Sequence, residues 1–170
     1  MLQIGNGLTS RSTQKAKRLG KSKKGLQVLG CTKIFTLPYF LWELTEYSLK
    51  TVELTVKDLG FPNGATMPQI FRQASELGLN LCPLELGPYL RLTYFDQPES
   101  DKKRDSQQGD APSGSITIDS EIVSADDEFP KGFYLRNVKG ELWLRGYIAD
   151  DLHVWNSYDR FIFGETKHHD

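Results

Sequence analysis

The stretch TMPQIFRQASELG, from Thr66 to Gly78, decides the fold because several local signals in it agree on one helix. Thr66 is a good N-cap residue, and Gln69 three positions later completes a capping box by reaching back to the Thr66 backbone. Pro68 stands in the first turn, where a missing N–H costs nothing, and Gly78 can end the helix in a left-handed conformation. We therefore predict a helix over about residues 66–78.

The apolar side chains of this helix predict the face that it buries. Ile70, Ala74 and Leu77 fall on one side at spacings of four and three, and Phe71 widens the stripe. A helix of about three turns is marginal alone and must pack on another element. The side chains expected to face outward are Arg72, Gln73 and Glu76.

Strand patterns dominate the rest of the chain and indicate the surface on which the helix packs. TVELTVK, residues 51–57, alternates so that Val52, Leu54 and Val56 would share one face. Further strands are predicted at 89–95 (YLRLTYF), at 115–124, at 133–138 and 141–148 as a hairpin turning at Lys139-Gly140, and at 160–163. Repeating strand–helix units are absent from this pattern. The expected fold is therefore an α+β domain with a mainly antiparallel sheet and one clear helix packed on it.

Charge divides the chain into an arm and a body. Residues 1–33 hold eight Lys and Arg and no acid, whereas the remaining residues hold 13 bases and 22 acids. The arm is rich in Gly and Ser and lacks an apolar period, so we predict that 1–33 is flexible. Residues 34–165 are expected to form a single domain, with a polar loop at 97–114 and a frayed tail at 166–170.

Cysteine usage and hydropathy favour a soluble cytoplasmic protein. Cys31 and Cys82 lie far apart and neither belongs to a Cys-x-x-Cys pair, so both are expected to be reduced. No apolar run approaches the roughly 20 residues that span a bilayer, so no membrane association is expected. A basic start before the apolar stretch 34–42 leaves a signal peptide open, and the acid-free start leaves a transit peptide open.

Three segments of the body are similar to a family of uncharacterised bacterial proteins. They read DLGFPNGAT, ASELGLNLCPLELGPYLRL and TYFDQP, and the C-terminal pieces FYLRN, ELWLRG and RFIF extend the resemblance over roughly residues 52–165. The family has no assigned activity, so the resemblance implies no catalytic residue. Its recurring Gly, Pro, Leu and aromatic residues imply a shared fold. The segment 99–114 is longer and more charged than the family pattern.

Residues that could support catalysis are few. Cys82, His153 and an acid at Asp150 or Asp151 form a conceivable nucleophilic triad. Cys82 precedes Pro83 and does not begin a helix that would lower its pKa, so a packed cysteine and a surface histidine are favoured. We predict no catalytic residue.

Metal and cofactor patterns are weak as well. The candidate clusters lack the spacing of a calcium loop or a zinc site and are interpreted as solvated turns and a tail. No glycine-rich phosphate loop is present. No cofactor and no metal ligand is therefore assigned to the three clusters, Asp126-Asp127-Glu128, Asp150-Asp151 and His168-His169-Asp170.

Aromatic residues gather near the C-terminus, where they are either core or a binding surface. They are Trp143, Tyr147, Trp155, Tyr158, Phe161 and Phe163. Trp, Tyr and Arg dominate the residues that carry binding energy at protein interfaces. The candidate partner-binding residues are Trp143, Arg145, Tyr147, Trp155 and Arg160.

The function favoured by these patterns is a non-enzymatic protein-binding module of the inhibitor, immunity or adaptor type. One alternative is a hydrolase whose site forms only in three dimensions. The other is non-specific nucleic-acid binding through residues 11–33, whose positive charge would attract phosphates in a salt-dependent way.

Overall fold

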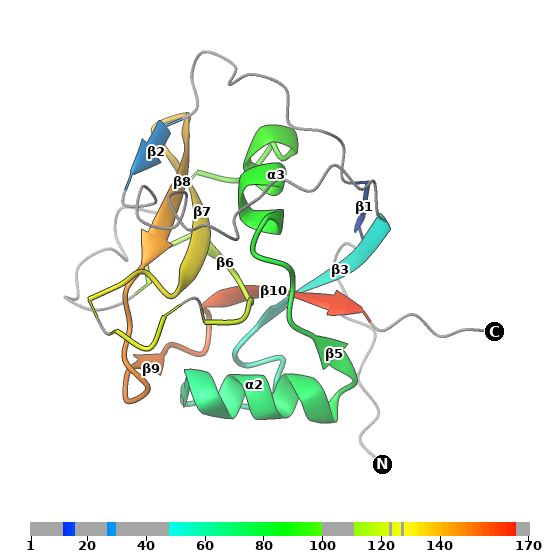
Figure 1. The fold of residues 1–170 in the computed structure, drawn as a ribbon, viewed down its shortest axis with the longest axis vertical. Coiled ribbons are helices and arrows are strands. Elements are labelled where there is room, and N and C mark those ends of the chain that lie inside the picture. Colours follow the sequence, from blue (N-terminus) through cyan, green and yellow to red (C-terminus); the bar gives the residue numbers. More distant parts are fainter. Residues whose placement is uncertain are drawn as a thin grey trace.

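The computed structural model describes residues 48–99, 111–122, 124–126 and 128–165, together with the strand backbones at 12–15 and 27–29. Its main sheet runs in the order β1-β3-β10-β6-β7-β8-β2, with β5 also pairing with β10 (Figure 1). β4 and β9 form a separate pair. The strands are β1 (Ser12–Lys15), β2 (Gln27–Leu29), β3 (Ser48–Thr55), β4 (Ala65–Thr66), β5 (Leu79–Asn80), β6 (Ile116–Ile118), β7 (Gly132–Val138), β8 (Glu141–Tyr147), β9 (Val154–Trp155) and β10 (Arg160–Glu165).

The helix predicted from Thr66 to Gly78 is confirmed as α2 (Met67–Glu76). Gln69 Oε1 accepts the Thr66 backbone N–H at 2.8 Å, which is the reach-back bond of a capping box, and Gly78 ends the helix at φ +73°. Of the predicted buried face, Ile70 and Ala74 are buried but Leu77 is not. Because the helix ends at Glu76, Leu77 lies in the following turn and is 38% exposed, while Met67 is buried in its place.

The strand predicted at 89–95 is wrong, because this segment belongs to a second helix, α3 (Leu86–Thr93). Leu86 and Leu90 are four positions apart and both are buried, so the helical period outweighs the short alternation that follows it. Gly87 lets α3 approach β7 closely, since a Cβ there would lie 2.8 Å from the Cβ of Phe133.

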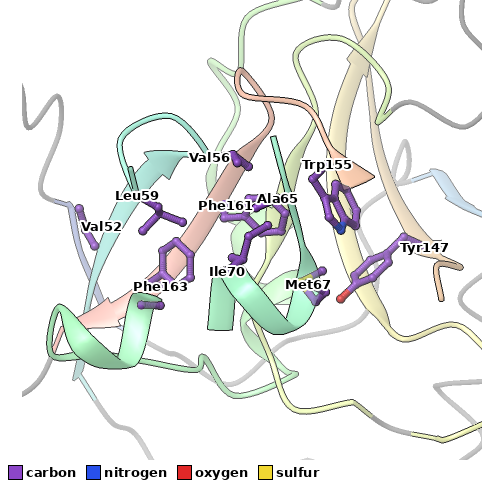
Figure 2. Close-up of a cluster of buried hydrophobic side chains, with 11 residues drawn as sticks. Val52, Val56, Leu59, Ala65, Met67, Ile70, Tyr147, Trp155, Phe161 and Phe163 are labelled. Atoms are coloured by element: carbon purple, nitrogen blue, oxygen red, sulfur yellow. The ribbon is translucent and has the colours of Figure 1, made fainter. Parts of the chain in front are cut away.

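The two helices cover opposite faces of the sheet. Neighbouring residues of a strand point to opposite faces, and on β10 they pack into different clusters. Ile162 joins the buried cluster that contains Leu86 and Leu90 of α3. Phe161 and Phe163 join the cluster around α2, where Figure 2 shows both rings beside Ile70. The fold is thus an α+β sandwich with the sheet as its middle layer.

The β7–β8 hairpin is confirmed at the predicted turn. Lys139 has φ +53° and Gly140 has φ +80°, the left-handed pair that a two-residue hairpin turn requires. The predicted last strand is also confirmed, as β10, whereas the described residues of 115–124 contain only the short strand β6. Most pairings in the sheet are antiparallel, as predicted, but β6 pairs with β10 and β2 with β8 in parallel.

The segment 1–33 is not without secondary structure. Ser12–Lys15 pair with β3 and Gln27–Leu29 pair with β8, so these residues add a strand to each edge of the sheet. The rest of the predicted arm and the tail 166–170 lie outside the described residues. In the predicted polar loop, 100–110 also lie outside them, but Gln97 at its start is buried and not solvated.

Candidate partner-binding site

The candidate site lies on one face of the β7–β8 hairpin. The register pairs Arg136 with Trp143, Tyr134 with Arg145 and Gly132 with Tyr147. Because side chains alternate between the faces of a strand, every second residue of each strand belongs to the same face. This outer face consists of Gly132, Tyr134, Arg136, Val138, Glu141, Trp143, Arg145 and Tyr147.

The opposite face of the hairpin is held in place by the core and by Gln97. Phe133, Leu135 and Leu144 pack against α3 in the first buried cluster. Gln97 Nε2 donates to the Leu135 carbonyl at 3.1 Å and to the Gly114 carbonyl at 3.1 Å. Its Oε1 accepts from Arg91 Nη1 at 2.6 Å. These bonds connect the end of α3 to β7.

Replacing Gln97 with alanine is expected to destabilise the protein by about 2 kcal/mol, because it leaves buried polar groups without partners. The groups that lose the Gln97 bond are Arg91 Nη1 and the carbonyls of Leu135 and Gly114, whereas Arg91 Nη2 keeps its bond to the Tyr94 carbonyl. Urea unfolding measures the effect, and Gln73→Ala is the matched control because no side-chain hydrogen bond joins the half-buried Gln73 to another described residue. Equal losses for the two variants would contradict the assigned role of Gln97.

A first hollow, of about 440 Å³, opens on the outer face near the hairpin turn. It brings three cationic side chains and one acidic side chain around a single indole ring. Arg145 lies over that ring, with its guanidinium carbon 5.9 Å from the ring centre, which is within the range of a cation–π contact. The lining residues are Arg136, Val138, Lys139, Glu141, Trp143 and Arg145.

Trp143 also retains an unused hydrogen-bond donor. In the part of the chain that the structure describes, its buried Nε1 has no hydrogen-bond partner. A buried indole N–H usually has an acceptor, so this unpaired donor is an exception in the described part of the site.

A second hollow, of about 360 Å³, lies further along the same face. The pair Tyr134 and Arg145 separates the two, since Tyr134 lines the second hollow and Arg145 the first. The aromatic side chains of the second hollow pack edge to face. The centre of the Trp155 ring lies 5.7 Å from that of Tyr147 and 5.0 Å from that of His153. The lining includes no Asp, Glu, Lys or Arg among the described residues.

Half of the exposed large apolar side chains lie close in the sequence to residues that line the second hollow. Of the eight large apolar side chains that are exposed in the described residues, four lie between 148 and 158. Leu152 is 83% exposed, and Ile148 also lines the second hollow. The four are Ile148, Leu152, Val154 and Tyr158.

The five residues proposed from the sequence do not form one surface. Trp143 and Arg145 lie together in the first hollow, whereas Tyr147 and Trp155 are largely buried and line the second. Figure 2 shows these two rings packed together beside Met67. Arg160 lines neither hollow and forms an ion pair with Glu53. Burial raises the pKa of Glu53 above its ordinary value, and the charge of Arg160 offsets only part of this rise.

Sequence reasoning missed Arg136, Lys139 and Tyr134. A usable signal was present, because the hairpin turn at Lys139-Gly140 fixes the register. That register places Arg136 opposite Trp143 and Tyr134 opposite Arg145.

The conceivable catalytic triad is not assembled. Cys82 is buried, its Sγ donates to the Ile162 carbonyl at 3.5 Å, and burial, with the nearby Asp119 charge, raises its pKa to about 12. His153 instead packs its ring against Trp155, and its backbone N–H donates to Asp150 Oδ1 at 2.7 Å. Cys82 therefore has the environment of a packed thiol and not of a nucleophile.

Comparisons with known proteins add no family to this description. No protein family, no curated protein and no solved structure was found to match the chain. Within the described residues, no group of three His, Cys, Asp or Glu side chains is placed to hold a metal ion. Neither α2 nor α3, the helices of the described residues, has the length and apolarity needed to cross a bilayer.

Proposed function

We propose that this chain is a non-enzymatic binding module for another protein, of the inhibitor, immunity or adaptor type. The observation that carries the proposal is the first hollow, in which Arg136, Lys139 and Arg145 surround Trp143. Tryptophan and arginine are the side chains most enriched among residues that dominate binding energy. Their combination on one rigid hairpin supports binding more than it supports chemistry.

The charge of the hollow contrasts with that of the rest of the body. Residues 34–170 carry 13 bases and 22 acids, yet the lining of the first hollow holds three bases and one acid. A local positive site on an acidic surface selects partners by charge and disfavours association with like surfaces. The partner is therefore expected to present acidic groups to the hairpin.

Trp143→Ala is expected to abolish capture of the protein partner while leaving the fold intact. The full chain serves as bait in extracts of its source cell, and retained proteins are quantified by mass spectrometry. Arg145→Glu should act in the same direction because it reverses a charge in the hollow. Loss of an interface hot-spot side chain costs about 2 kcal/mol or more, a roughly 30-fold drop in affinity.

Arg72→Glu provides the matched control, because it makes the same charge reversal on the exposed side of α2. This variant should retain the partner. Thermal unfolding of all three variants separates loss of binding from loss of fold. If Trp143→Ala and Arg145→Glu keep every partner that the unchanged chain captures, the proposal fails.

Two alternatives from the sequence keep a narrower basis. The hydrolase hypothesis is supported by one residue, His153, which lines the second hollow. No carboxylate is present with it among the described lining residues. Nucleic-acid binding through residues 11–33 rests on their charge alone. We also propose that the protein is cytoplasmic, and the buried free thiol of Cys82 is compatible with a reducing compartment. We further propose that the chain belongs to the family of uncharacterised bacterial proteins that residues 52–165 resemble.

A further inference from the structure

We infer that the partner binds as an extended segment that places acidic side chains over the first hollow and an aromatic side chain in the second. This inference rests on the proposed function and specifies the chemistry of the partner. Its basis is that the two hollows are consecutive on one sheet face and differ in character.

The strand register supplies the geometry. Successive pairs on the outer face are Arg136 with Trp143, Tyr134 with Arg145, and Gly132 with Tyr147. Trp143 and Tyr147 are four residues apart on β8, so their positions are separated by about 13 Å at roughly 3.3 Å per residue. An extended segment has the same rise, and its alternate side chains point to the same side. Three alternate side chains of the partner can therefore match three successive pairs.

Charge complementarity indicates which side chains of the partner face each hollow. The first hollow and the dividing pair contribute Arg136, Lys139 and Arg145, to which carboxylates are complementary. The second hollow lacks charged Asp, Glu, Lys and Arg in its described lining and is walled by Tyr134, Tyr147 and Trp155. Its volume of about 360 Å³ lies at the lower end of the range of small-ligand pockets, which is room enough for one aromatic side chain. An aromatic group fits this wall through edge-to-face contacts.

The two indole N–H groups provide separate reporters for the two hollows. Trp143 lines the first and Trp155 the second, and neither Nε1 has a partner among the described residues. In a proton–nitrogen NMR spectrum of the full chain, substitution of each tryptophan by phenylalanine assigns its indole signal. Each hollow can then be observed separately during a titration.

The test uses short blocked peptides as probes. The peptide acetyl-Asp-Thr-Glu-Thr-Phe-amide and its reversed sequence carry acids and an aromatic group on alternate positions. We expect one direction to shift both indole signals at millimolar concentration, and added salt to weaken the effect. Replacing both acids with Asn and Gln should remove the shift of Trp143, and replacing Phe with Ala should remove the shift of Trp155.

A variant that fills the second hollow gives an independent measurement. Ala149→Phe places a ring in the lining and should weaken binding of the aromatic peptide about tenfold or more. Ala125→Phe makes the same change at an exposed position that lines neither hollow and should leave binding unchanged. Both variants are checked by thermal unfolding.

The inference is overturned if no peptide in either direction shifts both signals, or if the alanine-ended peptide shifts Trp155 as strongly as the phenylalanine-ended one. Failure of the proposed function looks different, because protein capture would then survive Trp143→Ala. If capture depends on Trp143 while the peptides leave Trp155 unmoved, the proposed function stands and the second hollow has no part in it.

Discussion

Gly64→Ala is expected to lower the free energy of unfolding by about 3 kcal/mol or more, through a clash added to backbone strain. Gly64 has φ +89°, a conformation that costs an L-residue about 1–2 kcal/mol. A Cβ at this position would lie 2.5 Å from the backbone oxygen of Trp155, closer than real Cβ atoms come. Because that oxygen belongs to the β4–β9 pair, relief of the clash requires the pair to separate.

Gly60→Ala isolates the strain from the clash. Gly60 has φ +97°, close to that of Gly64, but a Cβ there would meet nothing within 4 Å. We expect this control to lose only about 1 kcal/mol. Urea unfolding gives the free energy of unfolding of both variants. The difference between their losses measures the cost of the clash between residue 64, just before β4, and the Trp155 backbone. Equal losses would mean that the turn and β9 separate at little cost.

The same turn shows what local sequence can predict. The helix that follows it was predicted with its Thr66–Gln69 capping pair and its final Gly78, because each signal lies within a few residues of the helix end that it marks. The hairpin was predicted for the same reason, since Lys139-Gly140 specifies its own turn. Caps and tight turns can be predicted from the sequence because they depend on residues only a few positions apart.

The second helix was missed because two periods overlap in it. Tyr89 to Phe95 alternates as a strand does, and the buried repeat that identifies α3 begins earlier, at Leu86. Whether a short apolar segment is helix or strand depends on what it packs against. Here the packing partner is Phe133, more than forty residues away, against which Gly87 fits without a side chain.

The candidate site was predicted only in part, for a related reason. Trp143 and Arg145 were identified by residue type, and the structure places them in one hollow. Tyr147 and Trp155 have the same composition signal but are buried in the cluster that contains Met67 and Ile70 of α2, and Figure 2 shows both rings beside Met67. Composition identifies aromatic side chains that favour interfaces, but only the layers of the fold determine which of them remain accessible.

Asp119 is the residue whose environment the sequence concealed most completely. Its backbone N–H donates to the Ile162 carbonyl at 3.1 Å, and its own carbonyl accepts from Cys82 at 2.6 Å, so the main chain is held on both sides. The side chain is 0% exposed, and neither carboxyl oxygen has a hydrogen-bond partner in the described ranges. Burial raises the pKa of Asp119 to about 8.

This shift makes stability depend on pH in a defined direction. The ordinary pKa of the group is 3.8, so between about pH 4 and pH 8 the folded state holds a proton that the unfolded state has released. The contribution of Asp119 to stability is therefore largest below about pH 4, falls as the pH rises through this window, and levels off above the folded pKa. The neighbouring Cys82 and Tyr147 have pKa values raised by burial and then by Asp119, so both ionise above this window.

Asp119→Asn is expected to stabilise the protein near pH 9 by about 3 kcal/mol or more, because the amide never acquires the buried charge. Near pH 4 the protonated acid and the amide are both neutral, and the two proteins should unfold at nearly the same urea concentration. The measurement is the difference in unfolding free energy across this pH range. Asp151→Asn, the same change on an exposed turn, controls for the altered net charge. A stability difference between Asp119→Asn and the unchanged chain that stays constant with pH would show that Asp119 does not hold its proton in the folded state.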